Sequence, residues 1–89
     1  MYSLAFYDAR MSVAEANTRK LNDQDRLLAD QIREFREKKG LSQQELSRMV
    51  GRYDSYISYI EEYRRGLSLT SVYDIARALE IKVGNLFTF

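Results

Sequence analysis

The sequence predicts an all-α fold, a compact bundle of about five short helices preceded by an N-terminal extension. Apolar residues recur at helical spacing in the second part of the chain. Glycines divide this part into segments that suit short helices joined by tight turns. With 89 residues, the chain is long enough for one small domain and too short for two.

The first helix is expected from about Asp23 to Lys39. Leu28, Ile32 and Phe35 follow one another at i, i+4 and i+7 and form an apolar stripe on one side of it. Gly40 comes directly afterwards and is expected to end the helix.

The second helix is expected to begin at the run Ser42 to Glu45. Its Ser-Gln-Gln-Glu sequence is a capping box, in which serine and glutamate satisfy amide groups at a helix start. Leu46, Met49 and Val50 form the predicted inner face, and Gly51 ends a helix of barely two turns.

Two more helices and a final turn are expected after Gly51. The third helix spans about Asp54 to Tyr63, and Ser68 or Thr70 caps the fourth. The apolar face of the fourth helix recurs at helical spacing and consists of Leu69, Val72, Ile75, Ala76 and Leu79. The run from Lys82 to Phe87 predicts one more helical turn.

Residues 1–21 are expected to form the N-terminal extension, and residues 22–89 the folded domain. The alternation of Tyr2, Leu4 and Phe6 with smaller or polar neighbours predicts a short strand, and Ser12 to Glu15 is a further capping-box pattern. An arm exchanged between subunits, an arm laid across the bundle and a disordered terminus remain open alternatives.

The composition excludes several classes of function. The chain has no cysteine and no histidine, so it lacks thiolate nucleophiles, the commonest general base and the commonest metal ligand. We therefore expect no enzyme, no metal and no cofactor. No apolar run approaches the roughly 20 residues of a membrane span, which predicts a cytoplasmic protein without membrane contact.

The arrangement of two short helices around Gly51 predicts a helix-turn-helix. In this motif the second helix of the pair lies in the DNA major groove. Spacing alone also fits a plain helical bundle. The net charge of only +1 gives no support for nucleic acid, so local placement of charge must provide it.

The residues themselves resemble the Cro/C1-type helix-turn-helix family, also called the xenobiotic-response-element family, over about Ile32 to Phe87. The residues in register are the glutamine at the second helix start, the turn glycine, the run Tyr56-Ile-Ser-Tyr-Ile-Glu61 and the apolar pattern up to Leu79. The resemblance implies a lambda-repressor-like bundle, usually dimeric, that regulates transcription by binding double-stranded operator DNA.

The chain departs from the family pattern at the turn and at its end. Arg52 replaces an aliphatic residue, and Tyr53 replaces a small capping residue, so Asp54 is expected to cap the third helix. Glu80 stands where a glycine commonly ends the fourth helix, and Gly84 weakens the last turn.

Five residues at the third helix are candidate base readers. A helical projection places Ile57 and Ile60 on the core side and leaves a polar arc opposite. The resemblance implies that Asp54, Ser55 and Tyr56 hold the reading positions and that Ser58 and Tyr59 lie behind them. We expect the Tyr56 ring to pack and its hydroxyl to point outward. For Asp54, capping is the alternative to base reading.

Candidate phosphate contacts flank these positions. Gln43 is the family's phosphate contact at the second helix start, and Arg52, Arg64 and Arg65 bracket the third helix. Glu61 and Glu62 oppose the phosphate field, and we expect Glu61 to pair with a nearby arginine. We therefore expect each monomer to bind weakly, so that tight binding requires a dimer on two half-sites, which one turn of the duplex spaces by about 34 Å.

The homodimer is expected to use apolar residues near the C-terminus, with Val83, Leu86, Phe87 and Phe89 as candidates. Closure of the subunit's own core is an equal alternative for Leu86 and Phe87. The regulator is expected to be of phage-repressor or restriction-modification controller type. Alternatives are an antitoxin that represses its own operon and binds a protein partner, and an interaction module that has lost DNA binding.

Overall fold

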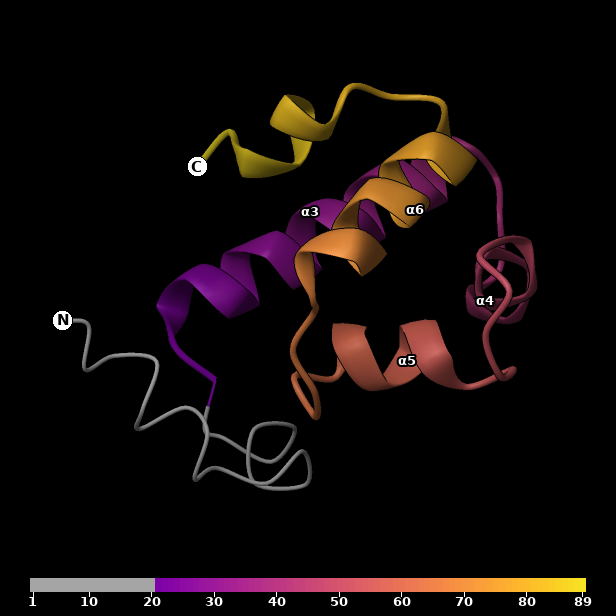
Figure 1. Cartoon of the computed structure of the whole chain (residues 1–89), viewed down its shortest axis with the longest axis horizontal. Coiled ribbons are helices and arrows are strands. Elements are labelled where there is room, and N and C mark those ends of the chain that lie inside the picture. The colour runs from indigo at the N-terminus through magenta and orange to yellow at the C-terminus, as the bar shows by residue number, and fades with distance from the viewer. Residues whose placement is uncertain (1–20) are drawn as a thin grey trace, which may run out of the picture.

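A computed structural model describes residues 21–89, and the predictions for residues 1–20 lie outside the described residues. The described part contains four α-helices and one 3-10 helix (Figure 1). In chain order they are α3 (Asp23–Lys38), α4 (Gln43–Met49), α5 (Tyr56–Glu61), α6 (Leu69–Leu79) and η1 (Val83–Phe87). The predicted all-α fold is confirmed, with a 3-10 turn as its last element.

The starts of α3 and α4 are both fixed by capping boxes. At α3, the Asp25 amide donates to Asn22 Oδ1 over 2.8 Å and the Asn22 amide donates to Asp25 Oδ2 over 3.0 Å. At α4, Ser42 Oγ accepts from the Glu45 amide at 2.9 Å, and the Glu45 carboxylate accepts from the Ser42 amide at 2.7 Å. These bonds lower the pKa of Glu45.

The recognition-helix candidate α5 is shorter than predicted. It begins at Tyr56, and Ser55 in the N-cap position makes no side-chain cap. Asp54 was expected to cap this helix, and that expectation is wrong, because its carboxylate accepts from α4 instead. The helix ends at Glu61, and Tyr63 adopts a left-handed φ of 61° that stops it.

The fourth helix, α6, is capped by Ser68, whose Oγ accepts from the Ser71 amide at 3.1 Å. It ends at Leu79, and Glu80 in the C-cap position takes the left-handed conformation, with φ 60° and ψ 40°, that usually belongs to glycine. The Glu80 carboxylate is paired with Lys39, and this contact lowers the Glu80 pKa.

The core lies where α3, α4, α5, α6 and η1 meet. In Figure 1, α3 and α6 run through the middle, η1 lies above them, α5 below and α4 at one side. Leu86 is completely buried, so η1 closes the core of its own subunit. Two predicted core residues are instead exposed, Met49 by 52% and Leu69 by 68%. None of the described helices is long and apolar enough to cross a membrane.

Candidate nucleic-acid interface

The pair α4 and α5 is joined as a helix-turn-helix through a buried serine. Ser47 Oγ donates to the Gln43 carbonyl at 2.8 Å and accepts from the Ile57 amide at 2.9 Å. The Ser47 carbonyl accepts from the amide of Arg52 at 3.0 Å. One side chain therefore connects both helices, and its own backbone also holds the turn.

A buried ion pair connects α5 to α3. Arg36 donates from Nε and Nη2 to the Glu61 carboxylate at 2.7 and 2.9 Å, and from Nη1 to the Leu41 carbonyl at 2.7 Å. Gln43 Nε2 donates to the same carboxylate at 2.9 Å. The hydrogen bonds that Arg36 donates to Glu61 raise the pKa of Arg36. The expected pairing of Glu61 with an arginine is confirmed, and this network fixes the orientation of α5 relative to α3.

The outer side of α5 carries half-buried polar residues. Ile57 and Ile60 face the core as predicted, whereas Ser55, Ser58 and Tyr59 keep part of their surface in solvent. Ser58 Oγ donates to the Ser55 carbonyl at 2.8 Å, which leaves its oxygen free to accept. Three of the five candidate base readers thus lie on an accessible polar face.

Tyr56 departs from the prediction. Its side chain is 1% exposed, and its Oη has no hydrogen-bond partner among the residues that the structure describes. The guanidinium carbons of Arg52 and Arg65 lie 5.2 and 5.0 Å from its ring centroid. The expected outward hydroxyl is wrong, because two arginines outside the helix cover the ring. In this conformation Tyr56 is a core residue.

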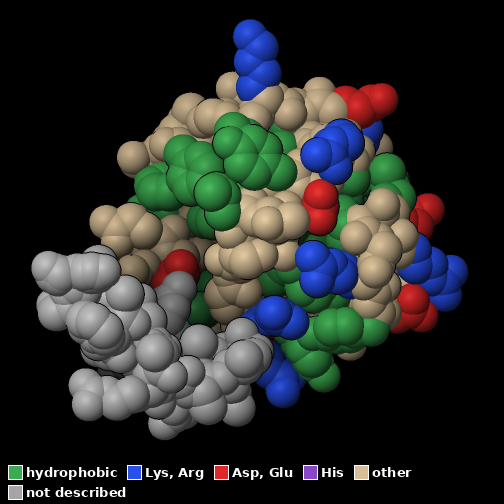
Figure 2. Space-filling model, viewed as in Figure 1, with side chains coloured by type: hydrophobic (Ala, Val, Ile, Leu, Met, Phe, Trp, Pro, Cys, Tyr) green, Lys and Arg blue, Asp and Glu red, His purple; other side chains and the backbone are tan. Residues whose placement is uncertain are grey.

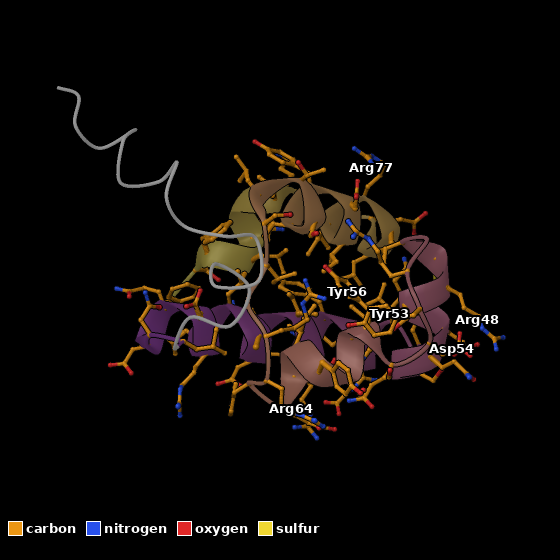
Figure 3. The ribbon with its side chains drawn as sticks, turned by 60° about the horizontal axis from the view of Figure 1, so that its bottom comes forward. Arg48, Tyr53, Asp54, Tyr56, Arg64 and Arg77 are labelled. Carbon is orange, nitrogen blue, oxygen red and sulfur yellow. The ribbon has the colours of Figure 1, made fainter. Side chains whose placement is uncertain are left out.

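Asp54 is exposed and belongs to a network that the sequence did not indicate. Arg48 donates to its carboxylate from Nε at 3.0 Å and from Nη2 at 3.1 Å, and Gln44 Nε2 donates at 2.9 Å. These bonds lower the Asp54 pKa. Figure 3 shows Arg48 and Asp54 side by side at the α4 end of α5. Their separation of six residues across a turn has no helical periodicity, so no pattern predicted it.

The flanking arginines are each engaged within the subunit. Arg52 Nη2 donates to Ser71 Oγ at 3.1 Å, and it lies 3.9 Å from Asp74, so its guanidinium is directed at α6. Arg64 lies 4.5 Å above the Tyr59 ring, with Nη1 3.5 Å from Glu62. Arg65 Nη1 donates to the Tyr53 hydroxyl at 3.1 Å. Arg64 and Arg65 therefore keep the predicted place beside α5.

The dimerisation candidates separate into two groups. Leu86 is fully buried in its own subunit and is removed from the set, whereas Val83 is half-buried. Phe87 and Phe89 are about half exposed, with ring centroids 6.2 Å apart. In Figure 2, hydrophobic side chains gather on the side of the molecule formed by α6 and η1.

Comparison with known proteins agrees with this geometry. The model of the helix-turn-helix family HTH_3 matches residues 32–86, more than half of the chain. The chain belongs to this Cro/C1-type family of helix-turn-helix transcriptional regulators. It is therefore a DNA-binding regulator and not an enzyme.

Relatives of this Cro/C1-type regulator cover most of the described residues. An uncharacterized HTH-type transcriptional regulator of Archaeoglobus fulgidus is 40% identical over 58 residues, which are 65% of this chain and 83% of the relative. The restriction-modification controller protein C.AhdI from Aeromonas hydrophila is 33% identical with a TM-score of 0.70, over 74% of this chain and all of that one. The controller protein C.Esp1396I, solved as a tetramer with its natural 35 base-pair operator, is 27% identical with a TM-score of 0.69, over 75% and 88%. The regulator thus has the fold of the controller proteins.

Proposed function

We propose that this regulator binds a palindromic operator as a homodimer, with α5 of each subunit in the major groove of one half-site. The observation that carries the proposal is the accessible polar face of α5 on a helix held rigidly by the Arg36–Glu61 pair and Ser47. Short polar side chains at an exposed recognition helix are the groups that read base edges. Ser55, Ser58 and Tyr59 are the proposed readers with Asp54.

Phosphate contacts are assigned to the arginines beside this face. Arg64 and Arg65 follow α5 directly, and their guanidinium groups are arranged by Tyr59 and Tyr53. Gln43 contributes at the start of α4, where Glu61 holds its amide. Arg52 reaches a phosphate only after leaving Ser71 and Asp74, so its contribution is smaller.

The dimer contact is assigned to the exposed aromatic residues at the C-terminus. Phe87 and Phe89 form an apolar pair on the surface, with half-buried Val83 beside them in sequence. Burial of such a pair against a second copy removes apolar area from water. Two copies related by a twofold axis place their α5 helices about 34 Å apart, one turn of the duplex.

The similarity to controller proteins supports a role of the same class, the control of transcription in a restriction-modification system. The tetramer of C.Esp1396I on its 35 base-pair operator supports binding to more than one half-site. This chain is expected to select a palindrome by the same symmetry rule.

Selection of operators from a random duplex library, followed by binding across a salt series, tests the proposal. The expected result is an enriched palindrome and an affinity that falls steeply with salt. Arg64→Gln should weaken binding to all sequences alike. Arg77→Gln is the matched control, because Figure 3 shows Arg77 and Arg64 on opposite sides of the molecule. If no operator is enriched and the affinity does not depend on salt, the protein is instead an interaction module without DNA binding.

Sedimentation of a Phe87→Ser/Phe89→Ser variant tests the dimer contact separately. We expect this variant to sediment as a monomer at micromolar concentration and to lose affinity for a full operator. Its affinity for an isolated half-site should stay unchanged. A variant that remains dimeric would assign the contact to another surface.

A further inference from the structure

We infer that Asp54 accepts a hydrogen bond from the amino group of a cytosine in each operator half-site, and that Arg48 and Gln44 position its carboxylate for this contact. The inference rests on the proposed function and specifies one base of the operator. It concerns residues on two different elements, since Arg48 and Gln44 belong to α4 and Asp54 to the turn before α5.

The carboxylate is held by three donors in a fixed geometry. Arg48 uses Nε and Nη2 on the two oxygens, at 3.0 and 3.1 Å, which is the forked arrangement of a bidentate pair. Gln44 Nε2 adds a third bond to Oδ2 at 2.9 Å. Two residues one turn apart on α4 therefore restrain this short side chain.

The network lies at the surface, where it contributes little to folding. The side chains of Arg48 and Asp54 are 64% and 52% exposed. Exposed ion pairs stabilise a fold only slightly. Three donors on one exposed carboxylate are therefore better explained by positioning than by stability.

The chemistry of the carboxylate selects the base. Its pKa is lowered by Arg48 and Gln44, so near neutral pH it is ionised and only accepts hydrogen bonds. Oδ2 already accepts two bonds and Oδ1 one, which leaves Oδ1 one position for a further donor.

Among the four base edges of the major groove, only cytosine offers an amino group without an acceptor on the same base beside it. Guanine and thymine present acceptors, and adenine places its N7 acceptor next to its amino group. A carboxylate is repelled by these acceptors. Arg48 also offsets the repulsion between Asp54 and the phosphates, which would otherwise keep a carboxylate out of the groove.

The test compares base preferences at every operator position for wild type and for Asp54→Asn. Asparagine has the same shape but pairs with N6 and N7 of adenine. We expect one position in each half-site to change from cytosine to adenine, by about tenfold in relative affinity, which corresponds to about 1.4 kcal/mol. All other positions should keep their preferences.

Arg48→Met and Gln44→Met test the positioning role. Each should reduce the preference for cytosine at that one position while the thermal midpoint stays unchanged, a result that a structural role alone would not give. Arg77→Met is the matched control, because the exposed Arg77 forms an ion pair with Asp74 on α6 at 3.1 Å. It should alter no base preference.

The outcomes separate this inference from the proposed function. If wild type enriches no operator, the proposed function fails and the inference fails with it. If wild type enriches an operator but Asp54→Asn and Asp54→Ala retain every base preference, only the inference is overturned. If Arg77→Met lost the preference for cytosine as strongly as Arg48→Met, the role of Arg48 in positioning Asp54 would be overturned.

Discussion

The buried pair of Arg36 and Glu61 gives the sharpest prediction about stability. Arg36→Met removes two donors from a carboxylate whose side chain is only 1% exposed, and a third from the Leu41 carbonyl. Among the described residues, Glu61 then keeps a hydrogen bond from Gln43 Nε2 and has Arg33 Nε at 3.9 Å. An uncompensated buried charge of this kind costs about 3–5 kcal/mol.

This cost is large for a small domain. A free energy of unfolding of about 5 kcal/mol is expected at this length, so the single variant should retain at most about 2 kcal/mol of it. The double variant Arg36→Met/Glu61→Leu removes both charges and leaves apolar side chains in their place. We expect it to recover to within about 1 kcal/mol of wild type, because the loss comes from the isolated carboxylate rather than from missing attraction.

Urea unfolding followed by circular dichroism measures both variants. The single variant should show a much lower midpoint, and the double variant a midpoint near that of wild type with a similar slope. A loss below about 1 kcal/mol for Arg36→Met would refute the buried-charge argument. A double variant as unstable as the single would show that the hydrogen bonds themselves hold α3 and α5 together.

Three further changes test local features of the fold. Tyr56→Phe should raise the free energy of unfolding by about 1 kcal/mol, because it removes a buried hydroxyl without a partner among the described residues, and an altered base preference would contradict its burial. Glu80→Gly should stabilise α6 by up to about 1 kcal/mol by relieving the left-handed conformation, measured against Lys39→Met, which breaks only the ion pair. The bonds to Ser42 lower the Glu45 pKa, so their stabilisation is complete above about pH 4.3 and is lost as pH falls through the lower native value. Glu45→Gln should therefore flatten the acid limb of the thermal midpoint, and an unchanged acid limb would exclude this carboxylate as its source.

The features predictable from sequence are those set by neighbours within a few residues. The capping box of Ser42 and Glu45 and the helix ends at Gly40 and Gly51 need only local hydrogen bonds and a positive φ, which is 75° and 74° at the two glycines. The helical projection placed Ile57 and Ile60 on the core side of their helix, and both are buried there. These parts of the prediction required no knowledge of how the helices pack.

The predictions that were wrong concern features that depend on contacts between different elements of the fold. Tyr56 was expected to expose its hydroxyl because a helical projection contains only residues of its own helix. Arg52 and Arg65, which cover the ring, come from the segments on either side of that helix. Asp54 was expected to cap α5, but its carboxylate instead accepts hydrogen bonds from Arg48, a residue on another helix. Leu69 fits the apolar period of α6, but as the first residue of that helix it extends beyond the core.

The chain has 14 basic and 13 acidic residues, and the effect of an acidic residue on DNA binding can be tested at the end of α5. Glu62 forms an ion pair with Arg64 at 3.5 Å, so it competes for this arginine with the phosphates that Arg64 is proposed to contact, and it repels them. Glu62→Gln should free Arg64 and tighten binding about two- to fivefold for every sequence at low salt, the range of an exposed ion pair. The gain should disappear near 1 M salt, where screening acts within about 3 Å.

The control for this change is Glu34→Gln on α3, outside the helix-turn-helix, where Glu34 forms a similar exposed pair with Lys38 at 3.7 Å. Both variants alter the net charge equally, and they differ only in where the charge lies. Equal gains in affinity would mean that the overall charge governs binding. A gain confined to Glu62→Gln would mean that a nearly neutral chain binds DNA through the placement of a few arginines, with its own carboxylates limiting the affinity of each subunit.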